Sequence, residues 1–478
     1  MLFNSLEFAI FFAIVYGLYL VLPHQWQNKL LLAAGFIFYS SWDWRFFSLI
    51  ILLICIGYFC GMKIDGSKEA KTKKLFLSLS VVSSLAILGF FKYFNFFVSN
   101  LAGLLKAFGA PVEYHALNII LPMGISFYIF KTLTYPIDIY RGKMKPTKNI
   151  LDFALYVSFF LQLIAGPIQR AKDLLPQITA PRRIGLNDFY EGCSLIFWGL
   201  FLKIFVADNL SKVVAPVFAL NSSCSGAEIL LASYAFTFQL FCDFEGYSSM
   251  ARGLGRVMGF DIMLNFNLPF FAVNIQDFWN RWHISLSTWI RDYLYTPLFD
   301  ALSFIRGNPR IYITLLVSMS LMGLWHGAEW TFLFFGLYHG ALLVIYIILR
   351  SRFHIKRYIQ PKSVFGQQLW VWVRIFFMFQ LIAFGMMIFR AQSASHLFFL
   401  LHRLIFQFNG GAPKALLFQF LAFACPVFII QFGQYKTGDL MFIYHRHWLV
   451  KTVIYAIMLH LILGWGVMST EEFIYFQF

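Results

Sequence analysis

Charged residues are scarce in this sequence. Only 13% of its 478 residues are Asp, Glu, Lys or Arg, against about a quarter in a soluble globular chain. Hydrophobic residues make up 60% and aromatic residues 20%, and their runs extend from one end of the chain to the other. This composition excludes a soluble enzyme and predicts an all-α, multi-pass membrane protein. Because no stretch is polar enough for a separate soluble domain, we expect one integral-membrane domain over residues 1–478.

Cysteine is also scarce, and its spacing matches neither a metal site nor a disulfide framework. Most of the six cysteines lie in apolar runs, so we interpret them as packing residues and expect no structural metal. The opening stretch "MLFNSLEFAIFFAIVYGLYLVLP" lacks a basic n-region and a small-residue cleavage site. It is therefore expected to form a retained first span.

The charge that is present is mostly positive. The formal net charge is +16 at pH 7. Lys and Arg cluster in short stretches between apolar runs, at residues 61–74, 141–149 and 350–362. Short basic loops are typical of the cytoplasmic face of a multi-span protein. The positive charge therefore indicates membrane topology, and we expect no nucleic-acid partner.

The apolar runs predict about 11 transmembrane helices together with shorter half-helices, since a crossing needs roughly 20 residues. Residues 30–39 and 396–406 are too short to cross alone. The run 151–168 has basic clusters on both sides, so we expect it to re-enter the membrane and turn near Gly166 and Pro167. Non-helical backbone at membrane depth must be surrounded by protein or line a wet cavity, which indicates an internal cavity. No internal repeat is visible, which weighs against inverted-repeat transporters.

The densest polar stretch is "QDFWNRWHISLSTWIRDYLYTPL", residues 276–298. As one helix it carries a polar and an apolar stripe, which predicts an amphipathic helix at the membrane interface, closed by Pro297. The two stripes are Arg281, Ser285, Thr288 and Asp292, and Trp282, Leu286, Trp289 and Tyr293. His283 is open to two readings, an interfacial hydrogen-bonding histidine or a group that contacts substrate.

A second polar stretch, "LMGLWHGAEW" at residues 321–330, lies within an apolar run. His326 follows Ile311 by 15 residues, which in a helix places it roughly 22 Å along the span. Titratable groups at that depth are costly and usually face the bundle interior or a wet pathway. We therefore predict a functional role for His326. Glu329 is expected either to orient His326 or to cap the next span.

A third stretch, "FCDFEGYSSMARGLGR", ends an aromatic span at residues 241–256. Asp243 is a candidate for the wall of the same polar cavity. Glu245 is better explained by pairing with Arg252 or Arg256 at the helix end. The glycines that follow are not a phosphate loop, because their spacing differs and no strand precedes them.

In their order along the chain, these stretches resemble the bacterial membrane-bound O-acyltransferases. Within that family they are most similar to the alginate O-acetyltransferase membrane subunit and its peptidoglycan-acetylating relatives. The two histidine motifs are highly specific in combination. The similar segments include "LPMGISFYIFKTLTYPIDIYRGK" from Leu121, "AGPIQR" from Ala165, "DFEGYSSMARGLGRVMGF" from Asp243, "FWNRWHISLSTWIRDYLYTPL" from Phe278 and "GLWHGAEWTFLFFGLYHG" from Gly323.

The resemblance implies a ring of spans around a central tunnel in the bacterial cytoplasmic membrane. It makes His326 the catalytic histidine and His283 the second signature residue. It implies acetyl-CoA or another cytoplasmic acyl thioester as donor substrate, no bound cofactor, an extracytoplasmic polysaccharide as final acceptor and a partner acetyltransferase outside the membrane. Substrate-binding or supporting roles are expected, in addition, for Asp243, Trp325, Glu329, Arg281, Ser287 and Asp292.

The sequence also departs from the alginate-type pattern, which leaves the acceptor open. Glu245 stands where that pattern has Ser, and Ser249 where it has Asp. These positions are i and i+4 on a helix, so the carboxylate moves by one turn on the same face. After Pro297 the chain reads "LFDALSFIRGNPR" instead of "LGGNR". Two other functions remain open: D-alanyl transfer to teichoic acid, and a small-solute transporter or channel with His326 as proton relay.

Overall fold

The computed structural model describes residues 1–110, 112, 116–220, 222–353, 363–408, 414–467 and 473–474. Every regular element in this part of the chain is helical, which confirms the all-α prediction. Eight of the described helices are long and apolar enough to cross a membrane, in agreement with a multi-pass protein. They are Trp44–Gly66, Ala70–Ala107, Leu186–Val217, Gly226–Val257, Trp330–Arg352, Val364–Arg390, Lys414–Thr437 and Trp448–Trp465.

Three expected spans form helices that are too short or too polar to count as candidate membrane spans. This explains why eight candidates are found and not about 11. Two of them, α1 (Leu6–Val21) and α6 (Ile125–Tyr140), have 16 residues each, short of the roughly 20 that a crossing needs. The third, α15 (Asn308–His326), has 19 residues but carries Arg310 and ends on a histidine. Helix α6 is buried along almost its whole length, so it serves as an interior element.

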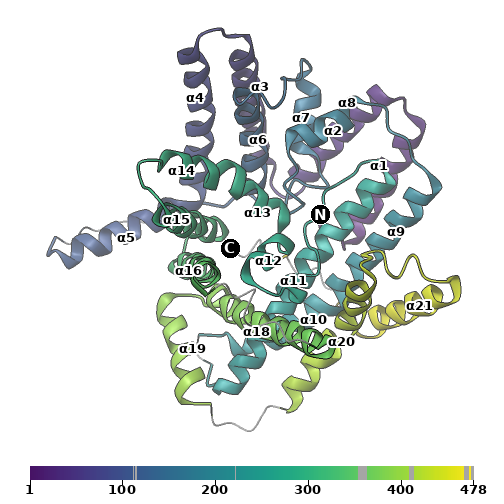
Figure 1. The fold of residues 1–478 in the computed structure, drawn as a ribbon. Coiled ribbons are helices and arrows are strands. Elements are labelled where there is room, and N and C mark those ends of the chain that lie inside the picture. Colours follow the sequence, from purple (N-terminus) through teal and green to yellow (C-terminus); the bar gives the residue numbers. More distant parts are fainter. Residues whose placement is uncertain are drawn as a thin grey trace. The chain divides into compact units, whose positions relative to one another are not determined.

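The described chain divides into two compact units by its contacts. These are Met1–Ile196 with Met250–Met263, and Phe197–Ser249 with Leu264–Phe478. In the first unit, α3 (Phe47–Gly66) and α4 (Ala70–Leu88) lie beside α6 (Figure 1). A Cβ atom on Gly61 of α3 would lie 2.5 Å from the Tyr135 ring of α6. Only glycine therefore allows this close approach.

The predicted re-entrant run begins with a short helix in the first unit. α7 (Ile150–Ser158) ends at Ser158, and residues 159–169 are buried without forming a helix. The turn thus begins at Phe159, earlier than the predicted Gly166 and Pro167. Gln162 holds it in place by donating to Gln169 (2.7 Å) and accepting from Lys131 (3.2 Å). Protein therefore encloses this non-helical stretch, which is the condition under which such backbone is tolerated at membrane depth.

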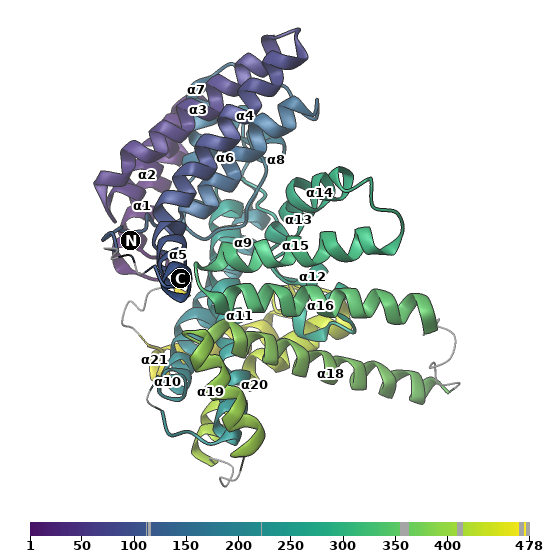
Figure 2. The same cartoon turned by 90° about the vertical axis from the view of Figure 1, so that its left-hand side faces the viewer.

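Helices α15, α16 and α18 form a packed layer in the second unit (Figure 2). α16 (Trp330–Phe353) contacts both α15 and α18 (Val364–Arg390). Glycines bring α15 and α16 into close contact. A Cβ atom on Gly323 would lie 2.1 Å from the Phe332 carbonyl oxygen, and one on Gly336 would lie 2.2 Å from that of Met319. The α15–α16 pair positions His326, the last residue of α15.

A π-helical segment, residues 201–207, joins α9 (Leu186–Leu200) to α10 (Asp208–Val217). All seven of its residues are buried, and it contacts α20 and α21 within the second unit. Such segments occur frequently at functional sites. The remaining long helices are α2 (His24–Ser40), α5 (Phe94–Ala107), α11 (Gly226–Val257), α19 (Ala394–Phe406), α20 (Lys414–Thr437) and α21 (Trp448–Trp465).

Candidate active site

The polar stretch 276–298 is broken at His283, so the prediction of one amphipathic helix is wrong. α12 (Ile275–Arg281) ends before His283, and α13 (Ile284–Ile290) begins after it. His283 itself has φ +42° and ψ +55°, a left-handed conformation that is uncommon outside glycine. Further along, Pro297 lies in the first turn of α14 (Thr296–Ala301) instead of closing the segment. The break places the imidazole in the interior, with no exposed surface.

A buried asparagine holds the break in place. The Ile284 amide donates to the Asn265 carbonyl oxygen (2.8 Å), and the Ser285 hydroxyl donates to the Asn265 side-chain oxygen (2.9 Å). The side-chain nitrogen of Asn265 donates in turn to Ser248 of α11 (3.2 Å). Asn265 therefore ties the first turn of α13 to α11. Sequence analysis missed this residue, whose only signal is its side-chain amide in the apolar stretch "IMLNFNLPFF", which also holds Asn267.

Aromatic rings surround the His283 imidazole. Its ring centroid lies 4.5 Å from that of Phe244, 6.4 Å from Phe266 and 6.1 Å from Trp325. His283 lies outside the eight candidate spans, but it is fully enclosed by protein. Burial lowers its pKa to about 3, because the protonated imidazole would lose its hydration. His283 is therefore a neutral imidazole at physiological pH.

His326 contacts the same indole ring. Its ring centroid is 4.9 Å from that of Trp325, and Phe389 and Phe335 lie at 5.2 and 6.0 Å. Only 6% of His326 is exposed. The structure thus brings the two histidines predicted from sequence to one aromatic centre, with Trp325 contacting both rings.

Asp243 belongs to a buried ionic cluster. Lys203 of the π-helical segment pairs with Asp208 at 2.8 Å and with Asp243 at 2.9 Å. The other carboxylate oxygen of Asp243 accepts a hydrogen bond from the Ile474 amide (2.7 Å). Asp243 therefore anchors α11 to two other segments, and its neighbour Phe244 contacts His283. Sequence analysis did not single out Lys203, because its i, i+5 spacing to Asp208 matches no α-helical pair.

The other candidate residues make local contacts around the break. Arg281 pairs with Asp277 at 2.8 Å, and the Ser287 hydroxyl donates to the Trp282 carbonyl oxygen at 3.1 Å. Farther along, Asp292 accepts from Arg291 at 2.7 Å. These contacts lie in α12, α13 and the π-helical segment Arg291–Tyr295 that follows them. Glu329 lies exposed just before α16.

The two positions that depart from the alginate-type pattern, 245 and 249, lie one helical turn apart in α11 and contact each other. The Ser249 hydroxyl donates to the Glu245 carboxylate at 2.8 Å, so the two exchanged positions face each other. Arg256, which sequence analysis considered as a partner for Glu245, pairs with Glu191 at 3.1 Å and Asp188 at 3.4 Å within the first unit. Glu245 therefore contributes a carboxylate to the α11 face that carries Ser249.

The arrangement suits acid–base chemistry at two imidazoles enclosed by aromatic rings. A buried imidazole can accept a proton from a hydroxyl and return it to a leaving group. Within the described part of the chain, no group of three or more His, Cys, Asp or Glu residues is placed to hold a metal ion.

Comparison with known proteins gives a consistent result. The model of the membrane-bound O-acyltransferase family matches residues 36–389, which include both histidines. The chain is 41% identical over 396 residues to the probable alginate O-acetylase AlgI of Azotobacter vinelandii, covering 82% of this chain and 76% of that protein. It is 34% identical over 383 residues to the peptidoglycan O-acetyltransferase of Helicobacter pylori, covering 72% and 70%. Over 233 residues it is 30% identical to the teichoic acid D-alanyltransferase of Streptococcus thermophilus, covering 47% and 56%.

Proposed function

The chain belongs to the membrane-bound O-acyltransferase family, and from this premise we propose a donor, a direction and a mechanism for it. It is a multi-pass membrane O-acyltransferase of cell-envelope polysaccharide modification. We propose that it transfers acetyl groups from a cytoplasmic thioester, acetyl-CoA, toward a hydroxyl outside the membrane. The relatives named for O-acetylation support acetyl as the group, since they match 72% or more of this chain.

We propose that His326 is the general base of the transfer. The acceptor hydroxyl attacks the thioester carbonyl while the His326 imidazole takes its proton. The carbon–sulfur bond then breaks, and the same proton passes to the leaving sulfur. A base positioned in this way contributes about 100-fold to 10,000-fold in rate. The observation that carries the assignment is that His326 and His283 are both buried and both contact one buried indole, that of Trp325.

His283 is proposed as the residue that positions the donor or the acceptor. Its lowered pKa keeps it neutral, so one ring nitrogen can donate and the other can accept a hydrogen bond. Its left-handed backbone is the kind of local strain that persists where the surrounding structure fixes a residue for function. His283 thus complements His326 without competing for the proton.

The first test is the substitution His326→Ala, which removes the base. Acetyl ester content of the envelope polysaccharide is expected to fall at least about 100-fold, with the amount of membrane-inserted protein unchanged. His402→Ala is the matched control, because His402 is an exposed histidine on α19. Normal acetylation by His326→Ala would contradict the proposed base.

Two alternatives, D-alanyl transfer and passage of a small solute, can be separated from acetyl transfer by supplying each donor or solute. D-alanyl transfer is supported by a similarity that covers only 47% of the chain, so acetyl transfer is the better supported. Purified protein in vesicles is expected to consume labelled acetyl-CoA when an extracytoplasmic acetyltransferase partner is supplied. Consumption of D-alanyl carrier thioester instead would identify the teichoic acid reaction. Passage of a small solute without acyl transfer would identify a channel.

A further inference from the structure

A large cavity with two arginines lies on the α16–α18 side of the second unit. It has a volume of about 750 Å³ and is bounded by α16, α18 and residues 273–275. Apolar side chains form most of its wall. They include Leu342, Ile345, Val373, Phe377 and Met378. Arg350 of α16 and Arg374 of α18 also line it, so the cavity combines an apolar surface with two positive charges.

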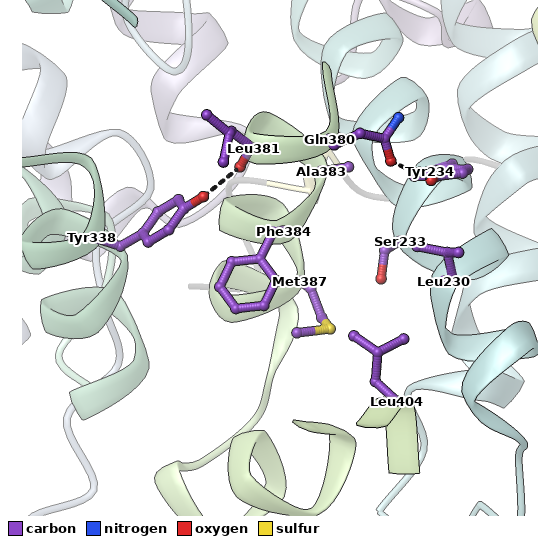
Figure 3. A pocket seen from close by; sticks show the side chains of 10 residues that line it. All are labelled: Leu230, Ser233, Tyr234, Tyr338, Gln380, Leu381, Ala383, Phe384, Met387 and Leu404. Carbon is purple, nitrogen blue, oxygen red and sulfur yellow. Dashed lines mark hydrogen bonds between the residues drawn. The ribbon is translucent and has the colours of Figure 1, made fainter. Parts of the chain in front are cut away.

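A smaller pocket nearby provides a contrast. It has a volume of about 420 Å³ and lies among α11, α16, α18 and α19 (Figure 3). Its two tyrosine hydroxyl groups already form hydrogen bonds within the protein. Tyr234 donates to Gln380, and Tyr338 donates to the Leu381 carbonyl oxygen at 3.0 Å. Its described lining residues include no charged side chain. Of these two cavities, only the larger one therefore offers positively charged side chains to a ligand.

The two arginines of the larger cavity have no acidic partner within the described residues. Arg374 is half-buried, and its Nε donates to the Val273 carbonyl oxygen at 3.1 Å. That bond holds the guanidinium at the cavity wall, and its other N–H groups form no hydrogen bond with described residues. An arginine within a span is costly unless it serves a pathway or a ligand.

The position of the arginines along the helices matches a lipid headgroup. Gln367 and Gln368 lie near the start of α18 (Val364–Arg390), and Trp370 follows as an interfacial aromatic residue. Arg374 comes four residues later, roughly 6 Å deeper along the helix. Arg350 lies near the end of α16, where the basic sequence 350–362 begins. The positive-inside rule assigns such a sequence to the cytoplasmic leaflet, which is rich in anionic lipid.

We propose that this cavity binds an anionic phospholipid of the cytoplasmic leaflet. Arg350 and Arg374 bind the phosphate, and an acyl chain lies along the apolar wall between α16 and α18. Basic pockets between transmembrane helices on the cytoplasmic side bind such headgroups. The lipid would join the two helices that carry Phe335 and Phe389, both of which contact His326.

The test is selective lipid retention by the purified full chain. Protein in detergent is mixed with dioleoyl phosphatidylglycerol or dioleoyl phosphatidylcholine, and bound lipid is counted by native mass spectrometry. The wild-type protein is expected to retain phosphatidylglycerol in preference to phosphatidylcholine. Arg350→Gln and Arg374→Gln should each lower its retention by about fivefold, the effect of one near-surface charge. Arg352→Gln is the matched control, because it removes the same charge two residues from Arg350 without touching the cavity wall.

Three outcomes would overturn the proposal. Equal retention of phosphatidylcholine would show that the headgroup is not recognised, and an equal loss in Arg352→Gln would reveal only diffuse attraction. Displacement of phosphatidylglycerol by coenzyme A would assign the cavity to the acyl donor, acetyl-CoA. Arg374→Lys keeps the charge and should keep retention. If Arg374→Gln does not fold, the exposed Arg350 and Arg352 variants still decide the question.

Discussion

At the scale of single residues, the backbone of His283 is as important as its ring. A residue with a Cβ atom in the left-handed region costs about 1 kcal/mol or more, whereas glycine has no such cost. His283→Gly and His283→Ala both delete the imidazole. We therefore expect the glycine variant to be the more stable by about 1 kcal/mol, although it has the smaller side chain. Denaturation of the two purified proteins measures this difference, and a more stable alanine variant would show that the left-handed backbone relaxes.

The buried neutral state of His283 also predicts a dependence of stability on pH. Its pKa is about 3 in the folded protein and 6.5 in the unfolded chain, so between these values only the unfolded chain binds the proton. The contribution of His283 to stability is complete above pH 6.5 and falls as the pH drops toward 3.

The stability difference between wild type and His283→Gly should therefore shrink by about 2 kcal/mol from pH 7 to pH 5. Chemical denaturation of both proteins at the two pH values measures this difference. All other titrating groups are present in both proteins, so their contributions cancel. A difference that stays constant would mean that the imidazole is hydrated.

At the scale of elements, the α15–α16 pair depends on Gly336. A Cβ atom there would lie 2.2 Å from a backbone carbonyl oxygen of α15, which cannot move aside alone. Gly336→Ala should therefore separate the helices, cost about 1–3 kcal/mol by overpacking, and reduce acetylation by displacing Phe335 from His326. Gly464→Ala in α21 is the matched control, since a Cβ atom there meets nothing within 4 Å. Melting temperatures and acetyl ester content measure both effects, and equal behaviour of the two variants would contradict the packing argument.

The elements also explain which parts of the site were predictable. Counting residues from Ile311 was enough to place His326 inside the protein, because helix rise is constant. The break at His283 was not predictable, because the stripe pattern of residues 276–298 fits one continuous helix. Its cause is Asn265, about twenty residues away along the chain, whose bonds replace those of the helix. The Lys203–Asp208 pair was hidden for a similar reason, since a π-helical turn changes the side-chain spacing.

At the scale of the whole molecule, apolar composition was sufficient to predict a multi-pass helical protein, because lipid leaves few ways to satisfy the backbone. The number of spans was harder to predict. α6 carries Lys131 and Asp138 yet is enclosed by other helices, so a hydrophobic run in the sequence does not distinguish an interior helix from one that faces lipid. Contacts between distant segments decide that distinction.

One such distant contact supports the site from outside the region that matches the family. The Phe473 ring is 2% exposed and lies 5.6 Å from Phe244 and 5.4 Å from Tyr247 by ring centroids. The next residue, Ile474, donates its amide to Asp243. Phe244 in turn contacts His283 at 4.5 Å, so residues 473–474 support the side chain that packs against the imidazole. The family match ends at residue 389, well before these two residues.

Phe473→Ala is therefore expected to destabilise the protein by about 3–5 kcal/mol, the usual cost of deleting a buried phenyl ring. Acetylation should fall too, because Phe244 loses its support and the His283 imidazole loses its fixed position. Phe365→Ala is the matched control: this ring is 76% exposed, and its loss should change stability by no more than about 0.5 kcal/mol. Thermal unfolding in detergent and acetyl ester content measure the two effects. Full activity in Phe473→Ala at a temperature where it stays folded would show that His283 is held by α11 and α13 alone.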